Sequence, residues 1–221
     1  QMNKESNALA RQLAEESIAL DPDYAFAYAI LAATHMMDVF LGSSKSPKDS
    51  IKQAIAINKK VLALDDSLPN AHSQLGLLYT MTRQHDKGVA EAKRGVELDP
   101  NSASAHRLLG ITLSYAGRPE EAIPVLKKAI RLEPFTPGIY YSNLGGAYRD
   151  AGQCDEAISA YEEALRRASS NFRVHAGATA AYSLCGREEE ARAAAAGVLR
   201  INPNFSCDSF AKTLPYKNQA D

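Results

Sequence analysis

Histidine and cysteine side chains are the groups of this chain that could bind a metal or act in catalysis. Three of the five histidines, His72, His106 and His175, recur at a spacing of about 34 residues or twice that. Histidines at such separations fall in successive structural units and do not converge on one ion, so we interpret them as packing residues. His35 and His85 have no cysteine or acidic residue at ligand spacing, and there is no HExxH sequence. The sequence therefore predicts no metal site.

The three cysteines, Cys154, Cys185 and Cys207, are odd in number and form no CxxC pair. This pattern argues against a disulfide framework and favours a reducing compartment. We therefore expect structural or incidental cysteines and a cytoplasmic location. The periplasmic side of a membrane-anchored parent protein stays open as the alternative.

Nucleotide-binding and nucleophile motifs are also absent: there is no GxxxxGK[ST] loop, no GxGxxG after a strand and no GxSxG elbow. We expect no cofactor and no catalytic role; a catalytic domain, if there is one, lies outside this chain. The net charge of −1 gives no reason to expect nucleic acid as a partner. No apolar run approaches the ~18 residues of a membrane span, and we expect no direct membrane contact. The abrupt start inside a helical pattern suggests a fragment of a longer protein.

A repeat of about 34 residues runs through the sequence. The Leu75-Gly76 pair returns at Leu109-Gly110 and Leu144-Gly145, and a turn glycine returns at Gly117, Gly152 and Gly186. Each unit has the pattern of two helices separated by that glycine, and a proline such as Pro134 follows the second helix. A helix pair cannot bury its apolar faces alone, whereas stacked pairs can, which explains the repetition.

These features closely resemble the tetratricopeptide repeat family. The resemblance implies an all-α fold, a right-handed superhelix of stacked antiparallel helix pairs, which is an α-solenoid. We divide the chain into a partial repeat with one second helix, five full repeats and a capping segment: 1–24, 25–68, 69–102, 103–136, 137–171, 172–205 and 206–221. The first full repeat is ten residues longer than its neighbours. The extra residues fall at 39–50, as either a partner-specific loop or, as we favour, an elaborated turn. Pro124 is expected to bend its helix locally, and Gly145-Gly146 indicates close approach of a neighbouring helix.

The family resemblance also implies a binding groove, because the first helix of each repeat lines the concave wall that usually receives a partner segment. The inward positions that we select as the partner-binding groove are Phe26, Met37, Asn70, Leu77, Arg107, Ile111, Ser114, Ser142, Arg149 and Arg173. Apolar residues at the N-terminal end predict apolar anchors on the partner. The three arginines predict an acidic group on the partner, unless they pair with acids of neighbouring turns such as Asp150.

The closing segment contains Phe205, Phe210 and Leu214 at a spacing that could cover the last repeat. Together with two other stretches, it resembles the tetratricopeptide regions of bacterial class III adenylate or guanylate cyclases and related regulators. That resemblance implies a regulatory or partner-sensing region of a bacterial signalling protein. We therefore expect a non-catalytic module that binds a protein or peptide in its groove. The alternative is a self-association scaffold, in which the chain forms homo-oligomers.

Overall fold

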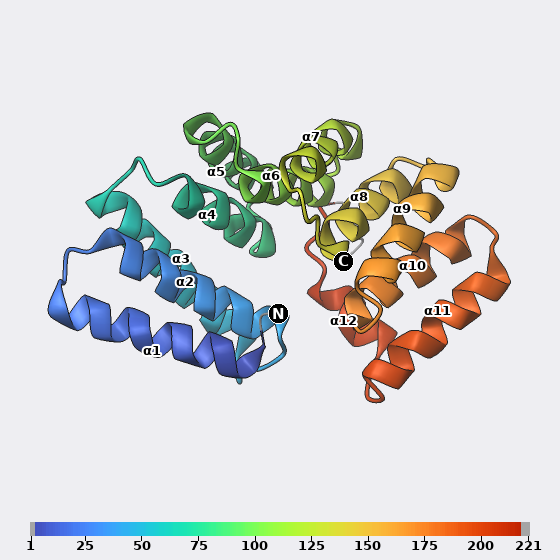
Figure 1. The fold of residues 1–221 in the computed structure, drawn as a ribbon, viewed down its shortest axis with the longest axis horizontal. Coiled ribbons are helices and arrows are strands. Elements are labelled where there is room, and N and C mark those ends of the chain that lie inside the picture. Colours follow the sequence, from blue (N-terminus) through green and yellow to red (C-terminus); the bar gives the residue numbers. More distant parts are fainter. Residues whose placement is uncertain (1–2, 218–221) are drawn as a thin grey trace. The chain divides into compact units, whose positions relative to one another are not determined.

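The computed structural model describes residues 3–217, and every regular element within them is a helix (Figure 1). The chain divides into two compact units, Gln1–Pro100 and Asn101–Asp221. Within each unit, consecutive helices form stacked antiparallel pairs, which confirms the predicted fold class.

Unit 1 contains a single helix followed by two helix pairs. Its helices are α1 (Lys4–Leu20), α2 (Ala25–Phe40), α3 (Pro47–Leu64), α4 (Pro69–Met81) and α5 (His85–Leu98). The pairs are α2 with α3 and α4 with α5, and α1 packs on α2 as the second helix of the partial repeat would. Small residues such as Ala32, Ala54 and Ala71 are fully buried beside Leu75 and Leu78, so the helix axes can approach closely.

Unit 2 contains three helix pairs and a short last helix. Its helices are α6 (Ala103–Tyr115), α7 (Pro119–Leu132), α8 (Gly138–Asp150), α9 (Cys154–Arg167), α10 (Phe172–Leu184), α11 (Glu188–Ile201) and α12 (Cys207–Thr213). The first helices α6, α8 and α10 lie side by side, and the second helices pack against them. No residue of α12 is buried, in contrast to the other helices of the unit.

The helices of the repeat end, and the turns between them form, at the residues that the sequence predicts. Helix α7 ends at Leu132, Glu133 caps it in an extended conformation, and Pro134 follows. Helix α5 likewise ends at Leu98, with Asp99 as its C-cap before Pro100. The turn glycines take a positive φ, for example +73° at Gly117 and +72° at Gly152, which costs an L-residue steric strain that glycine avoids. Helix α7 runs unbroken through Pro124.

The ten extra residues of the first full repeat lengthen its helices. Helix α2 has 16 residues and α3 has 18, against 13 and 14 in the next pair, α4 and α5. The connection is also longer, with residues 41–46 in place of 82–84. Within it, Ser43 and Ser44 donate backbone hydrogen bonds to the carbonyl of Asp38. The insertion is therefore an elaborated turn flanked by longer helices.

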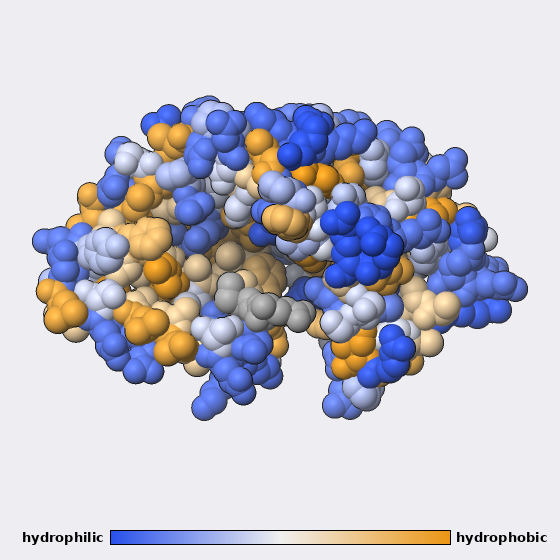
Figure 2. All heavy atoms as spheres, viewed as in Figure 1, coloured by the Kyte–Doolittle hydropathy of each residue, from blue (hydrophilic) through white to orange (hydrophobic). Residues whose placement is uncertain are grey.

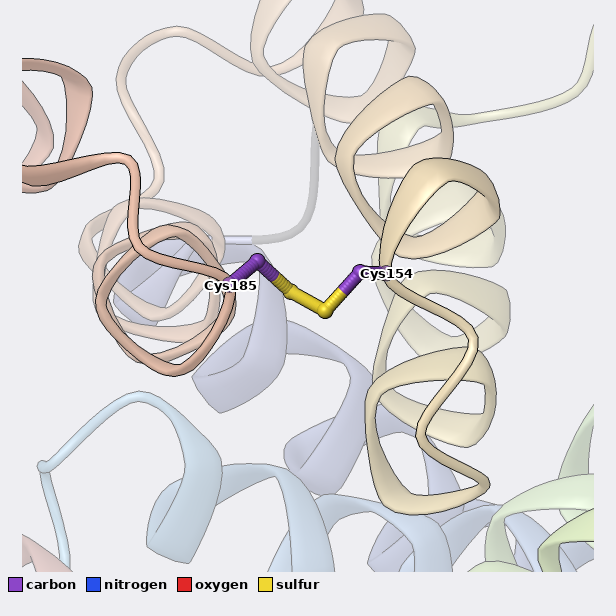
Figure 3. Close-up of a disulfide and its surroundings, with 2 residues drawn as sticks. All are labelled: Cys154 and Cys185. Carbon is purple, nitrogen blue, oxygen red and sulfur yellow. A yellow bond between two sulfur atoms is a disulfide. The ribbon is translucent and has the colours of Figure 1, made fainter.

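A disulfide joins Cys154 and Cys185, so the expectation that the cysteines stay reduced is wrong (Figure 3). Cys154 is the first residue of α9 and Cys185 caps the end of α10. Because α9 and α10 run antiparallel in contact, the start of one meets the end of the other, and the two Cα atoms lie 5.6 Å apart. Cys207 is a free, exposed cysteine.

Candidate functional site

The first helices of the repeats form one wall in each unit. We call α2 with α4 the unit-1 wall, and α6, α8 and α10 the unit-2 wall. In both walls neighbouring first helices contact one another directly, while the second helices form the other layer. Side chains on the open side of such a wall are available to a ligand without disturbing the core.

The unit-1 wall carries a hollow of about 230 Å³ whose surface is mainly apolar. It lies where α2 meets α1 and the start of α4. Its lining comprises Asn7, Ala10, Phe26, Ala29, Ile30, Ala33, Thr34, Met36, Met37, Leu68, Pro69, Asn70, Ala71 and Gln74. Phe26 remains 49% exposed at its rim, and Figure 2 shows apolar residues gathered on the surface over α1 and α2. An apolar side chain of a partner could fill this hollow and pack against the exposed phenylalanine.

Polar contacts fix one side of the hollow. Asn7 on α1 donates to the carbonyl of Thr34 at 3.1 Å and to the carboxylate of Asp38 at 2.9 Å. Arg11 forms an ion pair with Asp38 at 2.8 Å. Partial burial alone would raise the pKa of Asp38, but hydrogen bonds from Ser43, Arg11 and Asn7 lower it below its usual value. The carboxylate stays charged and anchors α1 to α2, so the hollow has a rigid edge.

Three of the four groove residues predicted in unit 1 lie at this hollow. Phe26, Met37 and Asn70 line it. Leu77 does not: it is 3% exposed and belongs to the core. A partner segment could not reach Leu77 without opening the helix pair.

The histidines that recur with the repeat have structural contacts. His72 Nδ1 lies 2.7 Å from a carboxylate oxygen of Glu91, and its Nε2 lies 2.9 Å from the carbonyl of Asp66. His175 Nε2 lies 2.9 Å from the carbonyl of Ser169 at the end of the preceding repeat. These contacts agree with the packing interpretation. Among residues 3–217, no group of three or more His, Cys, Asp or Glu is placed to hold a metal ion.

Two of the predicted arginines in unit 2 lie against aromatic rings. The guanidinium of Arg107 lies 5.3 Å from the ring centre of Tyr140, and burial lowers the pKa of Arg107. Arg173 lies 5.4 Å from the ring centre of Phe172 and 5.6 Å from that of Phe210. Cation–π contacts of this kind help to hold an arginine in place.

The third arginine pairs with an acid, which was the alternative left open. Arg149 donates to Asp150 Oδ1 from Nε at 2.9 Å and from Nη2 at 2.6 Å. Burial lowers the pKa of Arg149, but the neighbouring tyrosines and Asp150 outweigh it and raise the pKa overall. Near it, burial raises the pKa of Tyr161 to about 12, so that phenol stays neutral. Of the remaining predicted residues, Ile111 and Ser114 are half-buried and Ser142 is buried.

The closing segment packs on the unit-2 wall, and its extension to α6 and α8 goes beyond the capping of the last repeat that was expected. Phe205 and Phe210 pack against Phe172 with ring centres 6.2 Å apart, at the start of α10. Beyond α12 the chain returns along the first helices, and Tyr216 reaches the ends of α6 and α8. A capping role was expected for Phe205, Phe210 and Leu214. The contacts of Tyr216, two residues beyond Leu214, were not predicted.

Comparison with known proteins places these features in a family. Two family models described as tetratricopeptide repeat match residues 73–138 and 148–209, which together make up more than half of the chain. A comparison with curated proteins finds no match.

Solved structures with the same fold are numerous. YrrB, described as a TPR protein with an unusual peptide-binding site, is 20% identical; the match covers 91% of this chain and 98% of YrrB, with a TM-score of 0.55. MamA is 28% identical over 75% of this chain and 93% of its own, with a TM-score of 0.55. A thermophilic TPR protein from Thermus thermophilus, TTC0263, is 20% identical over 81% of this chain and 96% of its own, with a TM-score of 0.65. The stacked helix pairs, the repeat period and the two matching models lead to one conclusion: the chain belongs to the tetratricopeptide repeat proteins.

Proposed function

We propose that this chain is a non-catalytic interaction module whose unit-1 wall binds a segment of a protein partner. One observation carries the proposal: the apolar hollow on α2 and α4, with Phe26 exposed at its rim. Repeat proteins of this kind are typically non-catalytic scaffolds that bind peptides or proteins.

The chemistry of the hollow favours a particular kind of segment. Its volume of about 230 Å³ is below the ~300–1,000 Å³ of pockets that enclose small-molecule ligands. It suits one or two apolar side chains projecting from a longer segment. Gln74 lines the hollow, and within residues 3–217 its buried Oε1 has no hydrogen-bond partner. A rotation of this side chain would let the oxygen accept a backbone N–H of that segment. We infer that the partner segment carries an apolar anchor residue next to a main-chain amide that can donate a hydrogen bond.

The likeness to YrrB adds little to the inference on binding. YrrB is described as having an unusual peptide-binding site, but at 20% identity the likeness concerns the fold alone. The proposal therefore rests on this chain's own residues. Its wider role, as the regulatory region of a bacterial signalling protein of the cyclase-related type, rests on the resemblance of the closing segment.

A second candidate function, self-association, is favoured by a different surface. Leu9, Leu13 and Leu20 of α1 are 56%, 53% and 88% exposed, and Leu9 and Leu13 are one turn apart on the helix. An apolar stripe of this kind could pair with a second copy. A chain that stays monomeric at high concentration by light scattering would count against it.

The disulfide changes the compartment that we propose. The cytoplasmic expectation rested on reduced cysteines, whereas structural disulfides persist mainly in oxidising compartments. We therefore favour the periplasmic alternative. No helix within residues 3–217 has the length and apolarity to span a membrane. Mass spectrometry after rapid alkylation in cells should find Cys154 and Cys185 unmodified and Cys207 alkylated.

A displayed library of random peptides tests the binding proposal. We expect the wild-type chain to select peptides with a shared apolar anchor. A Phe26→Ser, Met37→Ser double variant should lose at least about tenfold in affinity for them, because each change removes apolar contact area worth more than ~1 kcal/mol. The matched control is Leu9→Ser, Leu13→Ser, which removes two exposed apolar residues outside the hollow. Equal loss in both double variants, or loss in neither, would contradict the proposal.

A further inference from the structure

The segment after α12 binds to the unit-2 wall as a ligand would. The chain is extended at Leu214, with φ −81° and ψ 124°, and Pro215 is buried. The backbone N–H of Lys217 then donates to the carbonyl of Tyr115 at the end of α6 at 2.9 Å. Figure 1 shows this part of unit 2, with the chain beyond α12 running back toward α8. We call residues 214–217 the tail.

Tyr216 supplies the specific contacts of the tail. Its ring meets the ring of Tyr115 edge to face, with centres 4.9 Å apart and planes at 81°. Its hydroxyl accepts a hydrogen bond from Arg149 Nη2 at 2.7 Å and donates one to Asp150 Oδ2 at 3.0 Å. Burial raises the pKa of Tyr216, so the phenol stays protonated and can donate. Arg149 and Asp150 thus form a paired donor and acceptor that match both functions of one hydroxyl.

The helix that carries the tail is attached weakly. None of its seven residues is buried, and its aromatic contact is the cluster of Phe172, Phe205 and Phe210. Segments with little buried apolar area open at a low free-energy cost compared with core helices. Opening of α12 therefore costs little, and release of the tail then requires only the loss of the contacts that residues 214–217 make, while the three helix pairs of unit 2 remain folded.

We propose that the ends of α6 and α8 form a tyrosine-recognition site, that the tail occupies it in cis, and that its partner in trans is an extended segment carrying a Pro-Tyr dipeptide. The site would bury the proline and contact the tyrosine ring through Tyr115. It would bind the tyrosine hydroxyl through Arg149 and Asp150, and accept a hydrogen bond from the next main-chain amide. The tail gates the site by competing for it. This goes beyond the proposed function by adding a second binding surface, whose residues are not part of the unit-1 hollow.

A fluorescent peptide with the sequence of residues 210–217, FAKTLPYK, tests the proposal by anisotropy against the full chain. A tethered tail competes at an effective concentration of about millimolar, so the wild-type chain should bind this peptide weakly. Tyr216→Ala should bind it about tenfold more tightly or better, because the site is then vacant. A peptide with phenylalanine in place of tyrosine should bind the Tyr216→Ala chain about tenfold more weakly, since it lacks both hydroxyl hydrogen bonds.

Controls separate this proposal from the others. Tyr24→Ala, at an exposed tyrosine of unit 1, should leave peptide binding at the wild-type level. Adding Phe26→Ser and Met37→Ser to the Tyr216→Ala chain should not weaken binding of the peptide. A failure of the proposal for the unit-1 hollow can therefore be told apart from a failure of this one. If Tyr216→Ala does not fold by circular dichroism, Tyr216→Phe keeps the ring and should still bind more tightly than wild type. No gain in affinity in the folded variant, or affinity indifferent to the peptide's tyrosine, would overturn the proposal.

Discussion

Two adjacent glycines on α8 show how much single atoms matter in this packing. A Cβ at Gly145 would lie 2.8 Å from Cδ2 of the buried Tyr161 ring, whereas a Cβ at Gly146 would meet only the Tyr161 hydroxyl, at an ordinary 3.5 Å. Both residues are inside the same helix. Their substitution by alanine should therefore have opposite effects.

We expect Gly145→Ala to lower the free energy of unfolding by ~1–3 kcal/mol, because the buried ring must move. Gly146→Ala should raise it by ~0.5–1 kcal/mol, since alanine loses less backbone entropy in a helix. Urea denaturation followed by circular dichroism measures both, and each variant is the control for the other. A stabilised Gly145→Ala chain would show that α8 and α9 are packed less tightly than described.

Residue roles set by local pattern could be predicted from the sequence, and roles set by distant contacts could not. The packing histidines and the turn glycines repeat with the period, so their environment follows from it. Tyr216 contacts Arg149 across 67 residues of sequence, outside any repeat. Arg149 was therefore expected to bind an acidic group of a partner, with pairing to Asp150 as the alternative. In the structure its guanidinium donates hydrogen bonds to Asp150 and to Tyr216 of the tail.

At the scale of elements, the disulfide links two helices from different repeats. It closes a loop with a sequence separation of 31 residues, and in the chain-entropy description a cross-link of this length stabilises by ~3–4 kcal/mol. The spacing rules for cysteines look for short motifs. The useful signal here was the position of each cysteine within its repeat. The start of a second helix faces the end of the following first helix, and the two cysteines lie at these two positions.

We therefore expect a reducing agent to lower the denaturation midpoint of unit 2. Cys154→Ser with Cys185→Ser should unfold at the midpoint of the reduced wild-type chain and should not respond to reductant. Cys207→Ser, which changes the free cysteine, should keep the full response. Identical midpoints for oxidised and reduced wild type would show that the cross-link contributes nothing to stability.

At the scale of the whole molecule, periodic sequence predicts most of the architecture. Proline after the second helix, glycine at the turn and alanine at the contacts recur because each pair must stack on the next. The longer first repeat was visible in the sequence. How the extra residues are divided between two lengthened helices and a longer connection was not, because Asp38 binds both α1 and the turn at Ser43. The hollow arises from that local arrangement, so its shape lay beyond the repeat pattern.

The central claim is that a partner segment binds the unit-1 wall, and amide chemical-shift mapping tests it most directly. A selected peptide would be titrated into the isotope-labelled chain. We predict the largest shifts at α2 and at the start of α4, around Phe26, Met37 and Asn70, with a saturable dependence on peptide concentration. Shifts confined to α1 at Leu9 and Leu13, or to the second helices α3 and α5, would contradict the claim.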